Sequence, residues 1–173
     1  MELCTEKIVL RPITDEDTEL VLMWRNNPQV KQYFIHREDI TPEEHRNWLN
    51  TSIYTGKAYQ FIILLRDSGL PIGSVYIQSI NNVHKSAEFG IFIGESAVNS
   101  KGCGTDAAKL MIHFALEELG LHKLYLRVLA DNQRAIRSYE KAGFVSEGVM
   151  RDEIYVDGRF RDVTRMSIIR EES

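Results

Sequence analysis

The amino-acid sequence predicts a single α/β (α+β) domain, spanning 1–173, in which helices flank a mixed and mostly antiparallel sheet. A chain of 173 residues has the length of one domain with a full hydrophobic core. Helical and strand patterns alternate along it, and neither an internal repeat nor a linker-like tract divides it. These observations favour one continuous domain over two.

The N-terminal part of the chain is expected to form one strand and two helices. Residues 7–11 alternate between apolar and polar side chains, as a half-buried strand does. Residues 14–24 combine an N-cap, an acidic first turn and apolar positions at helical spacing, and Pro28 ends this helix. Residues 41–54 begin with an N-cap threonine and a proline at the first helical position, which predicts the second helix.

The hydrophobic period then changes to that of strands. Three successive runs, 59–65, 70–80 and 87–93, are separated by turn residues and predict an antiparallel meander. Residues 105–119 keep a polar stripe opposite an apolar one, so they predict the longest helix, which Gly120 ends. The remaining expected elements are a strand at 121–129, a helix at 132–142, a strand at 144–150 and a closing hairpin at 154–169.

The charge balance and the cysteines restrict the class of protein. Lys and Arg total 21 against 25 Asp and Glu, a net charge of −4, which argues against a nucleic-acid or membrane partner. The N-terminus lacks the apolar core of a signal peptide, and no stretch approaches the ~20 apolar residues that span a bilayer. Cys4 and Cys103 are too few for a disulfide scaffold, so a cytoplasmic location is expected. No metal is expected either, because none of the predicted helices and strands carries a pair of His, Asp or Glu residues at the spacing of metal ligands.

A glycine-containing loop before the longest helix is the clearest chemical signal. Glycine lets the backbone approach a ligand closely, and a helix N-terminus offers unpaired N–H groups and a positive dipole end. The loop consists of Asn99, Ser100, Lys101, Gly102, Cys103, Gly104 and Thr105. A diphosphate site is one interpretation, and a tight strand-to-helix turn is the other. A P-loop is excluded because no Gly-Lys-[Ser/Thr] occurs, and too little chain follows for a doubly wound Rossmann sheet. A coenzyme A diphosphate site is the nucleotide interpretation that remains.

Two motifs resemble those of the GNAT superfamily of acetyl-CoA-dependent N-acetyltransferases. Residues 87–94 followed by 101–105 resemble its acetyl-CoA signature, with a departure at Asn99, where the family often has Arg or Gln. Residues 121–128, with 131–144 after them, resemble the next motif of the ribosomal-protein, spermidine and amino-sugar acetyltransferase branch. The resemblance implies a GNAT-like fold, acetyl-CoA as cosubstrate and direct transfer of the acetyl group to a primary amine in a ternary complex.

The resemblance also implies roles for particular residues. Tyr139 would protonate the departing thiolate of CoA, and Asn132 would contact the pantetheine arm. Phe92, Ile93 and the glycine loop would complete the cofactor-binding set. Glu88 would accept the proton of the amine through water, whereas the alternative is a strand-edge glutamate in solvent or in a structural salt bridge. For Tyr139 the alternative is an aromatic side chain packed on the sheet.

The acceptor side is expected in the N-terminal helices, where 24–28 and 44–48 combine tryptophans with cations. These segments resemble the sugar-nucleotide acetyltransferases of pseudaminic-acid synthesis, which implies that Arg25 and His45 bind the substrate. A nucleotide-linked amino sugar is therefore the first acceptor candidate. The alternative is that the tryptophans anchor the core and Arg25 is a surface cation.

Other functions stay open at this point. A polyamine or a protein N-terminus is the alternative acceptor, since the cations and acids between Trp24 and Trp48 balance. A non-catalytic acyl-CoA-binding module would need the glycine loop but not Tyr139 and Glu88, and a protein-interaction domain would need none of them. The sequence also leaves open whether the chain forms a homodimer.

Overall fold

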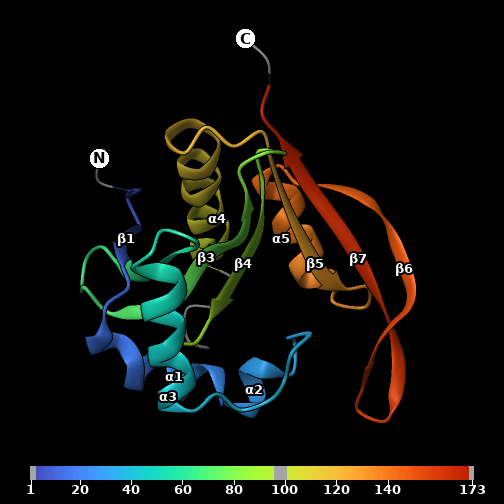
Figure 1. Cartoon of the computed structure of the whole chain (residues 1–173), viewed down its shortest axis with the longest axis horizontal. Helices are drawn as coiled ribbons and strands as arrows, with labels where there is room; N and C mark the ends of the chain where they lie inside the picture. Colours follow the sequence, from blue (N-terminus) through green and yellow to red (C-terminus); the bar gives the residue numbers. More distant parts are fainter. Residues whose placement is uncertain (1–2, 96–100, 172–173) are drawn as a thin grey trace.

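The computed structural model describes residues 3–95 and 101–171, and its strands form one seven-stranded sheet in the order β1-β2-β3-β4-β5-β7-β6 (Figure 1). All neighbouring strands are antiparallel except β4 and β5, which are parallel. The strands are β1 (Ile8–Pro12), β2 (Tyr59–Leu65), β3 (Pro71–Asn81), β4 (Ser86–Ile93), β5 (Lys123–Leu129), β6 (Val145–Val156) and β7 (Arg159–Ile169).

Helices cover both faces of this sheet. The helices are α1 (Thr18–Arg25), α2 (Pro28–Lys31), α3 (Pro42–Trp48), α4 (Cys103–His113) and α5 (Gln133–Ala142). A 3₁₀ turn, η1 (Asp15–Asp17), precedes α1, and π-helical turns η2 (Leu49–Ile53) and η4 (Phe114–Glu118) extend α3 and α4. No helix in the described ranges is long and apolar enough to span a bilayer.

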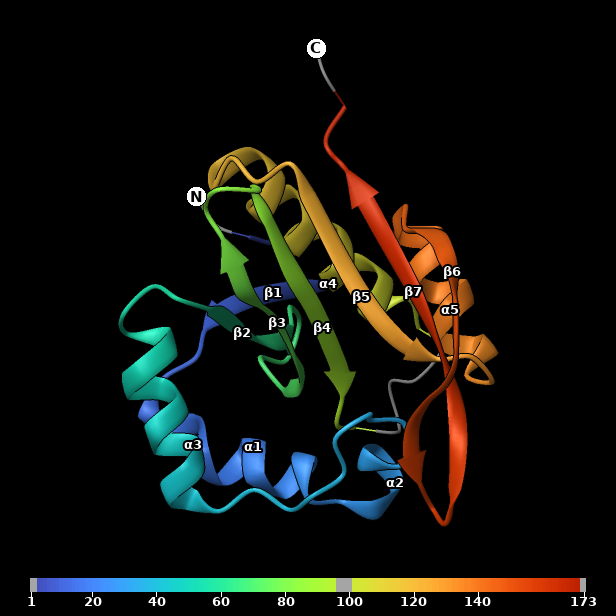
Figure 2. The ribbon, with the colours of Figure 1, turned by 45° about the vertical axis from the view of Figure 1, so that its right-hand side comes forward.

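The parallel pair of strands is short, and this creates the site. Ser86, Ala87 and Glu88 of β4 pair with β5, whereas β4 continues to pair with β3 as far as Ile93. In the same way, β5 remains paired with β7 up to Leu129. Figure 2 shows the two strands side by side at one end and diverging toward α1 and α2. The sheet therefore opens between its two central strands beyond Glu88.

The hydrophobic core has two parts, one on each face of the sheet. The larger packs α4 against the strands, and Phe89, Met111 and Leu124 belong to it. The smaller packs α1 against the sheet, and Trp24 and Phe92 belong to it. Each fully buried large apolar side chain contributes about 1.5–3 kcal/mol relative to exposure, so both helical layers are held mainly by this burial. The strand β4 sends Phe89 to one part and Phe92 to the other, because side chains alternate along a strand.

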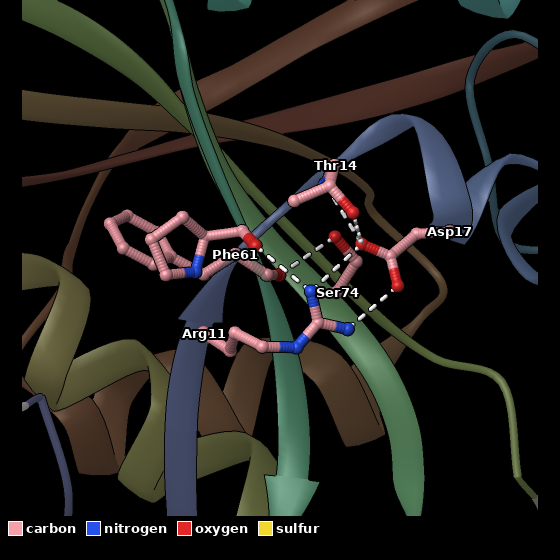
Figure 3. A network of polar contacts seen from close by, with 6 residues as sticks. Arg11, Thr14, Asp17, Phe61 and Ser74 are labelled. Atoms are coloured by element: carbon pink, nitrogen blue, oxygen red, sulfur yellow. Dashed lines mark hydrogen bonds and ion pairs between the residues drawn. The ribbon is translucent and has the colours of Figure 1, made fainter.

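A polar network fixes the connection from β1 into α1 (Figure 3). The Arg11 guanidinium donates to both carboxylate oxygens of Asp17, at 2.6 and 3.0 Å. The Thr14 backbone N–H donates to the same carboxylate at 2.8 Å, which closes the turn before the helix. Nearby, the Ser74 hydroxyl donates to the Phe61 carbonyl at 3.0 Å. This network sets where α1 begins and so where its C-terminal residues reach the sheet.

The predicted fold class and element order are confirmed, with two local differences. A short helix, α2, follows α1 directly, because Pro28 ends one helix and occupies the first position of the next. The Asn27 side chain caps α2 by accepting from the Gln29 backbone N–H at 3.0 Å. The predicted strand at 144–150 and the first arm of the hairpin are one strand, β6, with two register shifts against β7. Each shift changes which side chains face outward, so the alternation along β6 is lost.

Candidate active site

A cleft of about 920 Å³ lies at the opening between β4 and β5. One side of its wall comes from the N-terminus of α4 and from α5, and the other side from α1, α2 and the segment after α2. Its floor is formed by β3, β4 and β5. The cleft thus connects the two faces of the sheet through the gap between the central strands.

The N-terminus of α4 lies at one end of the cleft. Gly102 is its N-cap with φ +81°, and no side chain caps the helix. Residues Gly102 to Thr105 line the cleft, and a Cβ built at Gly104 would meet only Ile93 Cγ1, at 3.9 Å. This open backbone with uncapped N–H groups suits a diphosphate.

Lys101 of the predicted loop does not line the cleft. It is exposed, and its carbonyl accepts from Lys7 Nζ at 3.5 Å. Asn99 and Ser100 fall outside the described residues. Among the described loop residues, the backbone at 102–105 carries the diphosphate prediction.

The helix α5 forms the wall beside α4. The Thr105 and Ser138 hydroxyls are 3.1 Å apart and join the two helices. Asn132 lines the cleft, but its side-chain oxygen also accepts from the Ala135 backbone N–H at 3.3 Å and so caps α5. The helix adds three cations to the lining, namely Arg134, Arg137 and Lys141. Positive charge at this end of the cleft suits the phosphates of CoA.

Tyr139 reaches the cleft from the same helix. Its ring packs edge to face against Phe89 and Phe144, at centroid distances of 6.2 and 6.0 Å. Burial, with a smaller effect of Tyr76, raises the pKa of the Tyr139 hydroxyl. The phenol is therefore protonated at neutral pH and can donate a proton. The ring is packed as the alternative interpretation expects, and the residue also lines the cleft, so the proton-donor role of Tyr139 stays a prediction.

Glu88 lies where β4 and β5 separate, and it is ion-paired with Arg127 of β5. Arg127 Nε and Nη2 both donate to Glu88 Oε1, at 3.2 and 3.1 Å. Within the described part of the chain, Oε2 takes no hydrogen bond, and the Glu88 side chain is 15% exposed. The salt bridge expected as an alternative is present, and it leaves one oxygen for a proton arriving through water.

The two predicted substrate-binding residues differ in position. Arg25 lines the cleft, with its guanidinium carbon 4.8 Å from the Phe34 ring centroid, and its buried Nε has no hydrogen-bond partner in the described residues. His45 is 4% exposed between α3 and α1, where its Nδ1 is 3.0 Å from Thr18 Oγ1. It is outside the lining residues. Burial and the charge of Arg25 lower the pKa of His45, so the ring is neutral at neutral pH.

The tryptophans of these helices are core anchors. Trp24 is 1% exposed and its Nε1 donates to Glu95 Oε1 at 3.0 Å. Trp48 Nε1 donates to Gln60 Oε1 at 2.9 Å. A Cβ at Gly94 would lie 2.2 Å from the Trp24 ring, so this glycine is required for α1 to dock on the end of β4.

Besides the α5 cations named above, the sequence reasoning missed three residues of the site on the central strands, namely Tyr76, Gly90 and Arg127. All of them line the cleft on the central strands. A glycine inside an alternating strand often marks a close approach of another group, so Gly90 carried a signal that could have been used. Arg127 and Tyr76 carried no comparable signal, because their partners depend on the register between strands.

The comparisons with known proteins agree with this geometry. A family model described as an acetyltransferase (GNAT) domain matches residues 7–145. The spermidine N(1)-acetyltransferase of Escherichia coli (strain K12) is 34% identical over 161 residues, which are 93% of this chain and 85% of the relative. The putative ribosomal N-acetyltransferase YdaF of Bacillus subtilis (strain 168) is 29% identical over 152 residues, covering 87% and 77%.

A solved structure extends the similarity to the backbone. The spermidine N-acetyltransferase of Vibrio cholerae, crystallised with CoA and spermine, superposes with a TM-score of 0.88 and is 29% identical. The match covers 95% of this chain and 96% of that one. The GNAT-like fold, the acetyl-CoA cosubstrate and the transferase class inferred from the motifs are confirmed. The chain belongs to the GNAT acetyltransferases and is an N-acetyltransferase that uses acetyl-CoA.

Proposed function

We propose that the acceptor is a primary amine of a small molecule, with a polyamine such as spermidine as the first candidate. Relatives named as spermidine N-acetyltransferases support a polyamine better than the nucleotide-linked amino sugar expected from the sequence. The observation that carries the chemistry is the opening between β4 and β5, which has Tyr139 in its wall and Glu88 at its start. The proposal includes the cytoplasmic location expected from the sequence.

Different groups at the cofactor end of the cleft bind different parts of acetyl-CoA. Bound acetyl-CoA supplies the acetyl group and the thiol that leaves. The backbone N–H groups at the start of α4 bind the diphosphate, and the cations of α5 stabilise its charge. Asn132 and the end of β4 position the pantetheine arm.

Two residues move protons during transfer. Glu88 Oε2 takes a proton from the acceptor nitrogen through water, while Arg127 holds the other carboxylate oxygen. Tyr139 gives its hydroxyl proton to the departing sulfur, and its raised pKa keeps this proton on the hydroxyl at neutral pH until the transfer. One proton leaves the nitrogen and one reaches the sulfur, so the transfer balances without a covalent enzyme intermediate.

One observation favours a second acceptor class. Glu88 is the only carboxylate among the described residues that line the cleft, and Arg127 already neutralises it. A polycation needs carboxylates around it, because unlike charges stabilise one another and like charges repel. The cations in the lining are Arg25, Arg127, Arg134, Arg137 and Lys141, of which the last three lie on α5 at the cofactor end, so the described cation of the acceptor wall is Arg25. An acceptor that carries negative charge, such as a nucleotide-linked amino sugar, fits this balance and is the second candidate.

An acceptor screen by release of CoA thiol decides between the two. The panel contains spermidine, spermine, a peptide with a free N-terminus and amino sugars with and without a nucleotide. The highest kcat/KM on spermidine or spermine supports the polyamine, and the highest value on a nucleotide-linked amino sugar supports the second candidate. Absence of transfer to every amine, in a protein that binds acetyl-CoA by calorimetry, contradicts the proposed function.

A further inference from the structure

The Tyr76 side chain occupies an unusual position at the floor of the cleft. Tyr76 of β3 pairs directly with Gly90 of β4. A Cβ built at Gly90 would lie 2.2 Å from Tyr76 Cζ and 2.4 Å from its hydroxyl oxygen. The phenol ring therefore fills the space where a side chain at position 90 would be. It covers the backbone of β4 between Glu88 and Phe92, which share that face of the strand.

This face is the acceptor side of the opening. Phe92 belongs to the core that packs α1 against the sheet, and Arg25 at the end of α1 lines the cleft there. Tyr139 packs against Phe89, whose side chain points to the opposite face, where α4 and α5 lie. Tyr76 therefore lies across the opening from the groups that bind acetyl-CoA.

The surroundings of the Tyr76 hydroxyl keep it protonated. Burial and the nearby Glu88 raise its pKa, whereas the charge of Arg25 lowers it, and the net direction is upward. The phenol is neutral at neutral pH, and its oxygen retains a lone pair that can accept a hydrogen bond. Tyr76 and Tyr139 both line the cleft.

We infer that Tyr76 is a further residue of the reaction centre, where its hydroxyl oxygen accepts a hydrogen bond from the N–H of the attacking amine. Gly90 is the residue that leaves room for the ring carrying this oxygen. The inference rests on the proposed function, because it needs an amine acceptor. Tyr76 exchanges no proton in the reaction; it directs the nitrogen lone pair toward the acetyl carbon, and the proton transfers stay with Glu88 and Tyr139.

The first test compares Tyr76→Phe with the matched control Tyr155→Phe. Tyr155 is 66% exposed on the β6–β7 hairpin, so its hydroxyl removal should leave the kinetics unchanged. In Tyr76→Phe, kcat/KM for the amine should fall about tenfold, while the calorimetric Kd of acetyl-CoA stays within about twofold. A residue that only packs would lower the melting temperature and weaken both substrates alike.

A double-mutant cycle tests the role of Gly90. Gly90→Ala should lower kcat/KM for the amine in the wild-type background, because its Cβ displaces the ring. In a Tyr76→Ala background the same substitution should have little further effect, since the ring is gone. Equal losses in both backgrounds would show that Gly90 acts without Tyr76 and would overturn the placement.

The outcomes separate the two proposals. The Tyr76 inference is overturned if the wild-type protein acetylates an amine and Tyr76→Phe has the same kcat/KM for that amine. The proposed function is then intact. A wild-type protein that acetylates no amine contradicts the proposed function, and the inference falls with it. Loss of acetyl-CoA affinity in Tyr76→Phe would also overturn the inference, because it would place the hydroxyl on the cofactor side.

Discussion

Replacement of Tyr139 by phenylalanine removes one hydroxyl and keeps the ring that packs on Phe89 and Phe144. The edge-to-face contacts involve the ring carbons, so the fold and the α5 wall should survive. What is lost is the proton donor for the departing sulfur, and general acids contribute about 10²–10⁴-fold to such reactions. The cleft is open to water, and a water molecule can take over part of the role. We therefore expect kcat to fall about 10²-fold, which corresponds to ~2.7 kcal/mol of transition-state stabilisation.

The assay is steady-state release of CoA thiol, with both substrates varied and chemistry shown to be rate-limiting by single-turnover measurements. Because burial raises the pKa of Tyr139, the wild-type kcat should not fall through loss of this proton near neutral pH. The KM for acetyl-CoA should change much less than kcat. A kcat within about twofold of the wild type under these conditions would refute the assignment of Tyr139 as the proton donor.

Three further substitutions test other parts of the structure. Gly104→Val should fold, because its Cβ has room, but should weaken acetyl-CoA binding by about tenfold or more in calorimetry; unchanged affinity would reject the diphosphate site. Asp17→Asn should lower the free energy of unfolding by about 2 kcal/mol at pH 7 in urea titrations. Burial raises the pKa of Asp17, but the hydrogen bonds from Arg11 and Thr14 outweigh it and hold the pKa below its usual value. The stabilisation should therefore be complete above the unfolded pKa of about 3.9 and disappear as the pH falls through the lower folded value, and a pH-independent difference would contradict it. Arg127→Gln removes the ion pair that holds Glu88 Oε1 and should lower kcat with little change in the calorimetric Kd of acetyl-CoA, whereas an unchanged kcat would argue against a role of this pair in the reaction.

Local patterns predicted most of the fold because each depends on neighbouring residues. The strand predicted at 87–93 corresponds to β4, and the N-cap threonine predicted for the helix at 41–54 caps α3. The continuous strand β6 was not predicted, because its register shifts depend on hydrogen bonding to β7, which no local pattern records.

The candidate site was predicted only where a motif is contiguous. Gly102 to Thr105 and Tyr139 lie in the cleft as expected, because a strand–loop–helix unit positions its own residues. His45 was expected beside Arg25 in the substrate site, but the structure turns it into the interface of α3 with α1. The rotation of a short helix about its axis depends on packing against distant residues, so the sequence could not place this side chain.

The opening between β4 and β5 also has a consequence for the evolution of acceptor specificity in this protein. The groups proposed to hold the CoA phosphates stand on α4 and α5, whereas the proposed acceptor wall stands on α1, α2 and the loop that follows. Substitutions in the second set alter which amine is admitted without disturbing the first, since the sheet lies between them. Selection can therefore exchange one acceptor for another through surface loops while the acetyl donor stays the same. Such a layout accounts for relatives that share the fold with this chain and carry different acceptors in their names.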